Sequence, residues 1–194
     1  QNQPETPNFR SAVISCLYPV ADGPAGLRAA LDHIRAQASL EIAAGAQILI
    51  LSDRGSTKDL APIPSLLSTS AVHHHLIREK NRTRVGLVVE AGDARECHHM
   101  CLLIGYGAAA INPYLALEAV WQALQDGLLD KKAFPNTASI VYAYKKAVAK
   151  SMLKVMAKMG ISTLQSYKGA QIFEAVGLAD DIIKRCFEGT ASRV

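Results

Sequence analysis

Acidic, basic and amide side chains stand directly after three apolar runs of this chain, where a ligand or substrate could meet them. Residues 47–51 are followed by Ser52, Asp53 and Arg54, residues 85–89 by Glu90, and residues 108–111 by Asn112. A carboxylate in such a place can transfer a proton, and an arginine can hold a substrate carboxylate. The alternative is structural: Asp53 caps the next turn and Arg54 is paired to it.

The apolar runs predict the elements that position these side chains. A short, continuous apolar run between turn signals is typical of a strand buried on both faces. Expected strands and helices alternate over residues 11–17, 24–44, 47–51, 62–77, 85–90, 93–104 and 108–111. Such alternation predicts a parallel sheet whose strand carboxyl ends share one edge. We therefore expect Asp53, Glu90 and Asn112 on one rim.

The character of the chain changes after Pro113. Further helices are expected over 114–126, 137–158 and 178–186, without another strand signal of similar quality. We predict one α/β domain: a βα core over 1–112, built as a degenerate βα repeat around a four-stranded, mostly parallel sheet flanked by helices, and a helical C-terminal extension over 113–194. The extension cannot easily form its own core, so it should wrap the sheet or reach toward another domain.

Composition narrows the classes of function. The net charge of +4 is small and spread along the chain, whereas nucleic-acid binding needs a concentrated basic face. No apolar stretch approaches the ~20 residues of a membrane span. Residues 1–8 are polar and proline-rich, which does not fit a signal peptide, and the missing initiator methionine indicates processing or a segment of a longer chain. Four scattered cysteines are typical of a reducing cytosol.

The histidines and cysteines do not form a recognisable site. His73, His74 and His75 point in three directions on a helix, and His98 and His99 diverge in the same way. A composite site with one histidine from each helix is geometrically allowed, but metal-ligand spacings such as HExxH or CxxC are missing. Half-buried imidazoles bonded to the backbone, or to Asp53 and Glu90, are the better interpretation. A cysteine nucleophile at 97 or 101 beside His98 would be poorly placed, because neighbours on a helix do not face each other.

Phosphate-binding signatures are missing as well. Glu90 could hold a ribose as acidic strand ends do in dinucleotide folds, yet no GxGxxG follows the first expected strand. Gly105 and Gly107 precede a strand and therefore form a turn. We predict no catalytic, cofactor-binding or metal-binding residue, and keep six rim candidates for ligand binding: Asp53, Arg54, Glu90, His98, His99 and Asn112.

Several long strings resemble the central region of the glutamate synthase large chain, over about residues 45–194. They are LSDR at 51–54, IPSLL at 63–67, AVHHHLIR at 71–78, HHMCLLIGYGA at 98–108, INPYLA at 111–116 and KVMAKMGISTLQSYKGAQ at 154–171. Residues 1–44 fit as the preceding βα unit.

The resemblance implies a large multidomain parent that makes two glutamates from glutamine, 2-oxoglutarate and a reductant. Its glutaminase domain, with a cysteine nucleophile, and its synthase barrel, with FMN and a 3Fe-4S cluster, would lie outside this segment. The family's catalytic residues therefore have no position here, and a noncatalytic linker that holds the two active sites, with a surface that helps wall the ammonia path, is implied. The electron donor, ferredoxin or a nicotinamide-dependent small subunit, stays open, as does a cytoplasmic or, in a plant-like source, plastid location.

The alternative is a stand-alone α/β module that binds a small anionic metabolite or a metal at the strand-end rim.

If the chain is instead a linker within a larger enzyme, the isolated chain should expose apolar surface that normally meets other domains. Self-association into a homo-oligomer is the expected consequence.

Overall fold

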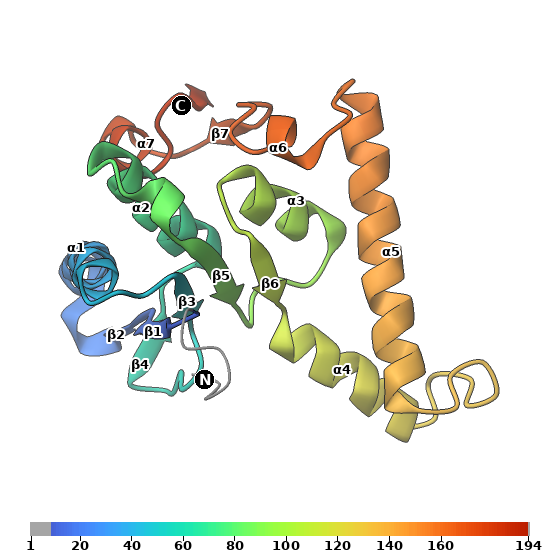
Figure 1. Cartoon of the computed structure of the whole chain (residues 1–194). Coiled ribbons are helices and arrows are strands. Elements are labelled where there is room, and N and C mark those ends of the chain that lie inside the picture. Colours follow the sequence, from blue (N-terminus) through green and yellow to red (C-terminus); the bar gives the residue numbers. More distant parts are fainter. Residues whose placement is uncertain (1–8, 194) are drawn as a thin grey trace.

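Four parallel strands form the central sheet, as the sequence predicts (Figure 1). The computed structural model describes residues 9–193, so the polar segment 1–8 lies outside the described residues. The strands are β1 (Ser11–Ser15), β3 (Ile48–Ser52), β5 (Gly86–Glu90) and β6 (Ala110–Asn112), and they pair in the order β1-β3-β5-β6. The predicted α/β class is confirmed.

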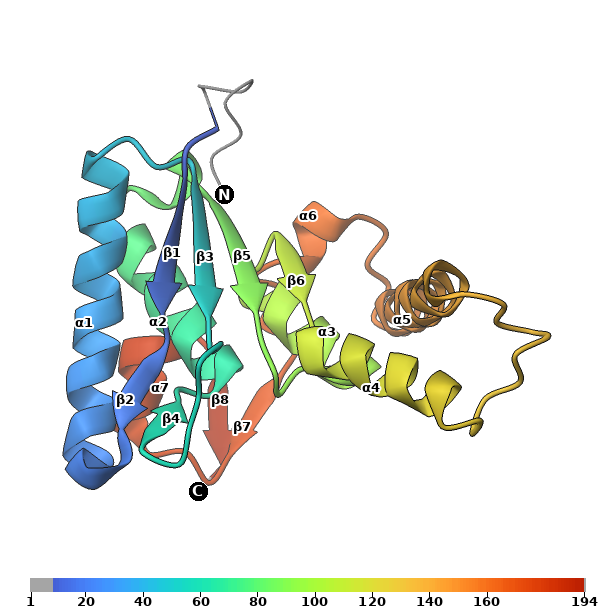
Figure 2. The ribbon, with the colours of Figure 1, turned by 90° about the horizontal axis from the view of Figure 1, so that it is seen from below.

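Three helices connect these strands: α1 (Gly23–Ala43), α2 (Ser65–Arg78) and α3 (Cys97–Gly105). In α1, Leu31, Ile34, Ala38 and Ile42 recur at helical spacing and are buried. Figure 2 shows α1 and α2 along the same side of the sheet. The side chains that the strands send toward the helices are almost fully buried: Ile14, Leu49, Leu51, Leu87 and Val89.

The opposite face of the sheet corrects the expectation that the strands are buried on both faces. Val13, Ile50, Val88 and Ala110 lie side by side in the pairing register of the four strands. Val13 is 62% exposed, Ala110 is exposed, and the other two are only half-buried. The reason is topological: when strand order follows chain order, right-handed crossovers place all the connecting helices on one face. The described part of the chain therefore leaves a row of apolar side chains accessible.

Short elements fill the connections. The first predicted strand, 11–17, ends earlier than expected, and β2 (Leu17–Pro19) instead pairs antiparallel with β4 (Leu60–Pro62), inside the segment predicted as a loop. Two short 3₁₀ turns, η1 (Val20–Asp22) and η2 (Arg82–Arg84), precede α1 and β5. The helix expected from residue 93 begins only at Cys97, where Glu96 and His99 form a capping box.

The C-terminal part contains the expected helices α4 (Tyr114–Gln125), α5 (Thr137–Lys158) and α7 (Asp180–Cys186). It also contains α6 (Leu164–Tyr167) and a parallel pair, β7 (Glu174–Val176) with β8 (Ala191–Arg193), that sequence patterns missed. Helix α7 packs on α2, while α4 and α5 form an arm that extends from the core (Figure 2). The division of the chain at residue 112 stays a prediction. Among the described residues, no helix is both long and apolar enough to cross a membrane.

Candidate functional site

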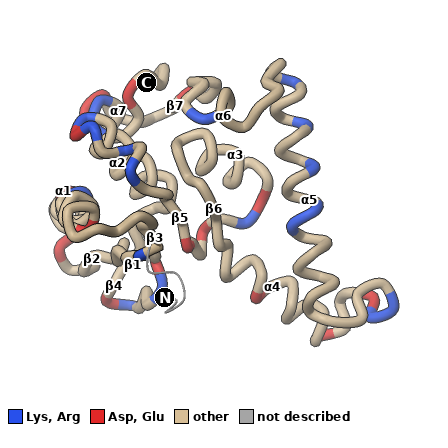
Figure 3. The backbone as a smooth tube through the Cα atoms, in the orientation of Figure 1, with Lys and Arg blue, Asp and Glu red and all other residues tan. Residues whose placement is uncertain are grey.

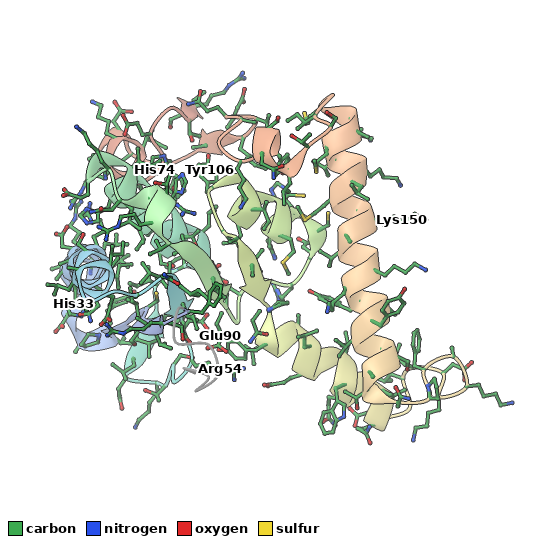
Figure 4. The ribbon with its side chains drawn as sticks, in the orientation of Figure 1. His33, Arg54, His74, Glu90, Tyr106 and Lys150 are labelled. Carbon is green, nitrogen blue, oxygen red and sulfur yellow. The ribbon has the colours of Figure 1, made fainter. Side chains whose placement is uncertain are left out.

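Glu90 is the centre of the strand-end rim. Ser15, Ser52, Glu90 and Asn112 occupy the last paired row of the sheet. Ser52 Oγ donates to one Glu90 carboxylate oxygen at 2.7 Å, while Arg54 Nε at 2.8 Å and Asn112 Nδ2 at 3.1 Å donate to the other. Four of the six predicted rim candidates lie at this edge: Arg54, Glu90 and Asn112 through these bonds, and Asp53, whose N–H donates to the Glu90 carbonyl at 3.2 Å. Figure 4 shows Arg54 and Glu90 close together.

The electrostatics of this cluster hold Glu90 ionised. Burial acts to raise the pKa of Glu90, but the hydrogen bonds from Arg54 and Ser52 outweigh it and lower that pKa below its usual range. The hydrogen bond to Glu90 raises the pKa of Arg54 in turn. The guanidinium also lies 4.0 Å above the centre of the Tyr114 ring, a cation–π geometry. Arg54 is thus paired with Glu90, and the alternative that paired it with Asp53 is wrong.

Asp53 is fixed by the backbone of a neighbouring loop. Its carboxylate is buried, and both of its oxygens accept from the Gly92 N–H, at 2.8 and 3.1 Å. Burial, with the hydrogen bond to Asp53 second, raises the pKa of Tyr114 to about 12, so this phenol stays protonated at neutral pH. The carboxylate of Asp93 is also bonded to the backbone, because it accepts from the Ser65 N–H at the start of α2. Asp93 was expected to cap α3, and it does not. Asp53 thus ties the end of β3 to the loop after β5, and Asp93 ties that loop to the start of α2.

We expect Glu90→Gln to lower the free energy of unfolding by about 1–2 kcal/mol at pH 7, because an amide gives three donors a poorer acceptor. Solvent screening limits the contribution of Arg54, whose side chain is 48% exposed. Urea unfolding followed by circular dichroism measures the change. The matched control is Glu118→Gln, which removes an exposed carboxylate 4.0 Å from the same arginine and should cost less than ~0.5 kcal/mol. Equal effects of the two substitutions would contradict this account of the rim.

An open hollow of about 500 Å³ lies beside the rim. Asp53, Gly92, Asp93, Arg95 and Tyr114 contribute to its walls. The Asp53 and Asp93 carboxylates that face it are already engaged by backbone N–H groups. Within residues 9–193, no three His, Cys, Asp or Glu side chains come close enough together to hold a metal ion.

His98 and His99 belong to the first turn of α3 and make other contacts. His98 is exposed and meets Phe173 edge to face, with ring centroids 6.1 Å apart. His99 Nδ1 accepts from the Arg95 N–H at 3.1 Å, which supports the start of the helix. Neither contact involves the Glu90 cluster, so the two histidines complete no site with it. A ligand-binding role for any of the six candidates stays a prediction.

The triple histidine makes structural contacts, and one of its rings, His73, belongs to a clamp formed by Arg82. The three imidazoles are half-buried, as expected, but their partners are not Asp53 or Glu90: His73 Nδ1 accepts from Arg82 Nε at 2.9 Å, and His75 Nε2 lies 2.8 Å from Ser39 Oγ. Arg82 also donates to the carbonyls of Val85, at 2.9 Å, and Gly107, at 2.6 Å. Sequence reasoning missed the role of Arg82 and predicted only a turn at Gly105 and Gly107, whose carbonyl this arginine contacts at residue 107. This arginine ties α2 to the loops that lead into β5 and β6.

A smaller cavity of about 190 Å³ lies between α2, the end of α3 and the C-terminal segment. Its walls include His74, Tyr106, Gln171 and Thr190, and Figure 4 shows His74 and Tyr106 near one another. The Tyr106 and Thr190 hydroxyls are 2.6 Å apart, and His74 Nδ1 is bonded to the Ser70 carbonyl at 3.0 Å. The hydrogen bond between Tyr106 and Thr190 thus joins the C-terminal segment to the end of α3.

Two of the four cysteines, Cys16 and Cys101, are buried thiols that are poor nucleophiles. Burial raises the pKa of Cys101 to about 11 and that of Cys16 to about 12, so both thiols stay protonated at neutral pH. Cys97 and Cys101 form the one close pair in the described chain, with sulfurs 3.8 Å apart. Iron–sulfur clusters are held by a larger set of converging thiolates, which these residues do not provide.

Comparisons with known proteins agree with the resemblance found in the sequence. The glutamate synthase central domain model matches residues 1–179. The chain is 47% identical to the glutamate synthase [NADPH] large chain of Bacillus subtilis, 45% to glutamate synthase [NADH] of Schizosaccharomyces pombe and 41% to ferredoxin-dependent glutamate synthase 2 of Synechocystis. These matches cover 97–98% of this chain but only 9–13% of each relative. The chain therefore spans about a tenth of the length of these curated relatives.

Proposed function

Because the chain belongs to the glutamate synthase central domain family, we propose that it is a noncatalytic spacer that holds the glutaminase and synthase domains of a glutamate synthase at a fixed separation. The parent reaction converts glutamine, 2-oxoglutarate and reductant to two glutamates. FMN and the 3Fe-4S cluster belong to the synthase domain in this proposal. The reductant comes from ferredoxin or a nicotinamide-dependent subunit, in the cytoplasm or in a plastid.

The single observation that carries the proposal is that the rim carboxylates are held in place by other groups of the chain. Glu90 accepts from three side chains, and Asp53 accepts from a backbone N–H through both oxygens. A general base needs a free lone pair facing the substrate and a pKa near the working pH. Glu90 has a lowered pKa instead, which suits a fixed structural anion better than a proton carrier.

The spacer role also accounts for surface that a free-standing domain would bury. The apolar row of Val13, Ile50, Val88 and Ala110 lies on the uncovered face of the sheet. The α4–α5 arm is little buried: Ala116 and Leu124 are the buried residues of α4, and Ile140 and Met156 those of α5. We propose that these two surfaces meet the neighbouring domains. A packed interior resists deformation, so contacts on both sides would hold those domains apart and wall part of the ammonia path.

Thermal unfolding of the isolated chain in the presence of ligands distinguishes the spacer proposal from the alternative of a stand-alone binding module. A ligand at 100 times its Kd stabilises the folded state by about 2.7 kcal/mol, which raises the Tm of a chain of this size by roughly 5–10 °C. We expect less than ~1 °C from 2-oxoglutarate, glutamine, FMN, Mg²⁺ or Zn²⁺. A shift of several degrees that disappears in Asp53→Asn would favour the alternative, ligand binding at the rim.

A further inference from the structure

All of the excess positive charge of the chain is located in α5. The whole sequence has 21 basic and 17 acidic residues and a net charge of +4. Helix α5 alone carries five lysines and no acidic residue, so the rest of the chain is close to neutral. Figure 3 shows the blue segments spaced along this helix. The expectation that the positive charge is spread along the chain is therefore wrong, because the lysines between 145 and 158 lie on a single helix.

Four of these lysines form a row. Lys146, Lys150, Lys154 and Lys158 follow one another at i, i+4 spacing, which places neighbours on the same side of a helix about 6 Å apart along its axis. All four are exposed, and Lys150 extends away from the body of the molecule in Figure 4. The ion pairs of the described chain join arginines, and one histidine, to carboxylates, and none of them involves a lysine of this row.

The row lies on a rigid support with apolar side chains beside it. The opposite side of α5 packs on the α3 cluster through Tyr144, Val148, Met152, Val155 and Met156. Tyr142 is 66% exposed and Leu153 is 65% exposed. Lys146 Nζ lies 5.9 Å from the centre of the Tyr142 ring. Lysines that surround exposed aromatic and aliphatic side chains are arranged as in a protein interface, with apolar anchors and a charged rim.

We propose that this face of α5, defined by Tyr142, Lys146, Lys150, Leu153 and Lys154, docks on an acidic protein surface carried by the remainder of the same polypeptide. Charge complementarity sets the sign of the partner. About nine-tenths of the length of the curated relatives lies outside this segment, which provides the covering surface. The face carries no arginine, the residue whose planar guanidinium best suits phosphate and nucleic-acid recognition, and only two large apolar anchors, few for insertion into a membrane. The inference rests on the proposed function only in placing the acidic surface on the same polypeptide.

Fluorescence anisotropy with three labelled probes tests this surface. The probes are an acidic peptide with glutamate at every fourth position, a 20-base-pair DNA duplex and vesicles containing anionic lipid. The test variant is Lys146→Glu/Lys150→Glu/Lys154→Glu. Its control, Lys58→Glu/Lys132→Glu/Lys184→Glu, has the same change in net charge at exposed lysines on other parts of the chain. A second variant with glutamine at 146, 150 and 154 removes the charge without reversing it, in case reversal impairs folding.

We expect the acidic peptide to bind the unaltered chain more tightly than DNA or vesicles do at 100 mM salt. Its Kd should rise about tenfold or more in the α5 variant, and less than threefold in the control. Equal losses in both variants, tighter binding of DNA or vesicles, or no binding of the peptide would each overturn the proposal. These outcomes are independent of the thermal-shift test, so the spacer function and this docking surface can fail separately.

Discussion

Substituting Gly107 by alanine should lower the free energy of unfolding by about 3 kcal/mol. Gly107 has φ of +109°, a conformation that an L side chain adopts only with strain of about 1–2 kcal/mol. A Cβ at this position would also overlap the imidazole of His73. That ring cannot easily move away, because Arg82 donates to it and to the Gly107 carbonyl at the same time. Overpacking of this kind costs a further 1–3 kcal/mol, so the two terms together give about 3 kcal/mol.

Two companion variants separate these terms. Gly160 also has a positive φ, +71°, but nothing lies within 4 Å of its Cβ position, so Gly160→Ala should cost about 1 kcal/mol from strain alone. In a His73→Ala background the obstructing ring is gone, and the additional cost of Gly107→Ala should fall to the strain of about 1–2 kcal/mol. Chemical denaturation of the four variants gives all of the values. If Gly107→Ala lowers the free energy of unfolding no more than Gly160→Ala does, the tight contact between Gly107, His73 and Arg82 is refuted.

Stability should fall between pH 6.5 and pH 5 because of the same imidazole. Burial first, and then the charge of Arg82, lower the pKa of His73 from 6.5 to about 3. The unfolded chain therefore binds a proton in this pH range that the folded chain does not bind, so the contribution is present above pH 6.5 and is lost as the pH falls toward 3. Linkage gives a loss of about 1.5 kcal/mol between pH 6.5 and 5 from this group.

The matched variant is His73→Asn, whose side-chain oxygen can still accept from Arg82 but does not titrate. Measured against it, the unaltered chain should lose about 1.5 kcal/mol more over this interval. His75 also has a lowered pKa because of burial, but it is present in both proteins and its effect cancels in the comparison. Parallel curves of stability against pH for the two proteins would show that His73 is not held neutral by the fold.

The sequence predicted the elements more reliably than their surroundings. Apolar runs identified all four strands of the sheet, because continuous Val, Ile and Leu between turn residues has few other meanings. The same runs wrongly predicted that both faces of the sheet are buried. An apolar run does not show on which face of the sheet the connecting helices lie. Strands β7 and β8 were missed because their sequences, EAV and ASR, are short and do not form continuous apolar runs.

The rim was predicted in part for a physical reason. Parallel strands must end at a common edge, so Glu90 and Asn112 could be placed together from the sequence. Partner choice could not be derived: Arg54 pairs across the sheet with Glu90, and Asp53 with a backbone N–H. The contacts of Arg82 could not be predicted from the sequence, because its three acceptors come from segments up to 25 residues away.

Steady-state turnover of an intact glutamate synthase that carries Glu90→Gln in this segment tests the central claim most directly. If the rim is a structural anion cluster, the variant should unfold at a lower denaturant concentration, while kcat per folded molecule stays within about twofold of the unaltered enzyme. A fall in kcat of a hundredfold or more at unchanged stability corresponds to about 2.7 kcal/mol of lost transition-state stabilisation. That result would place Glu90 in the chemistry and contradict the spacer account.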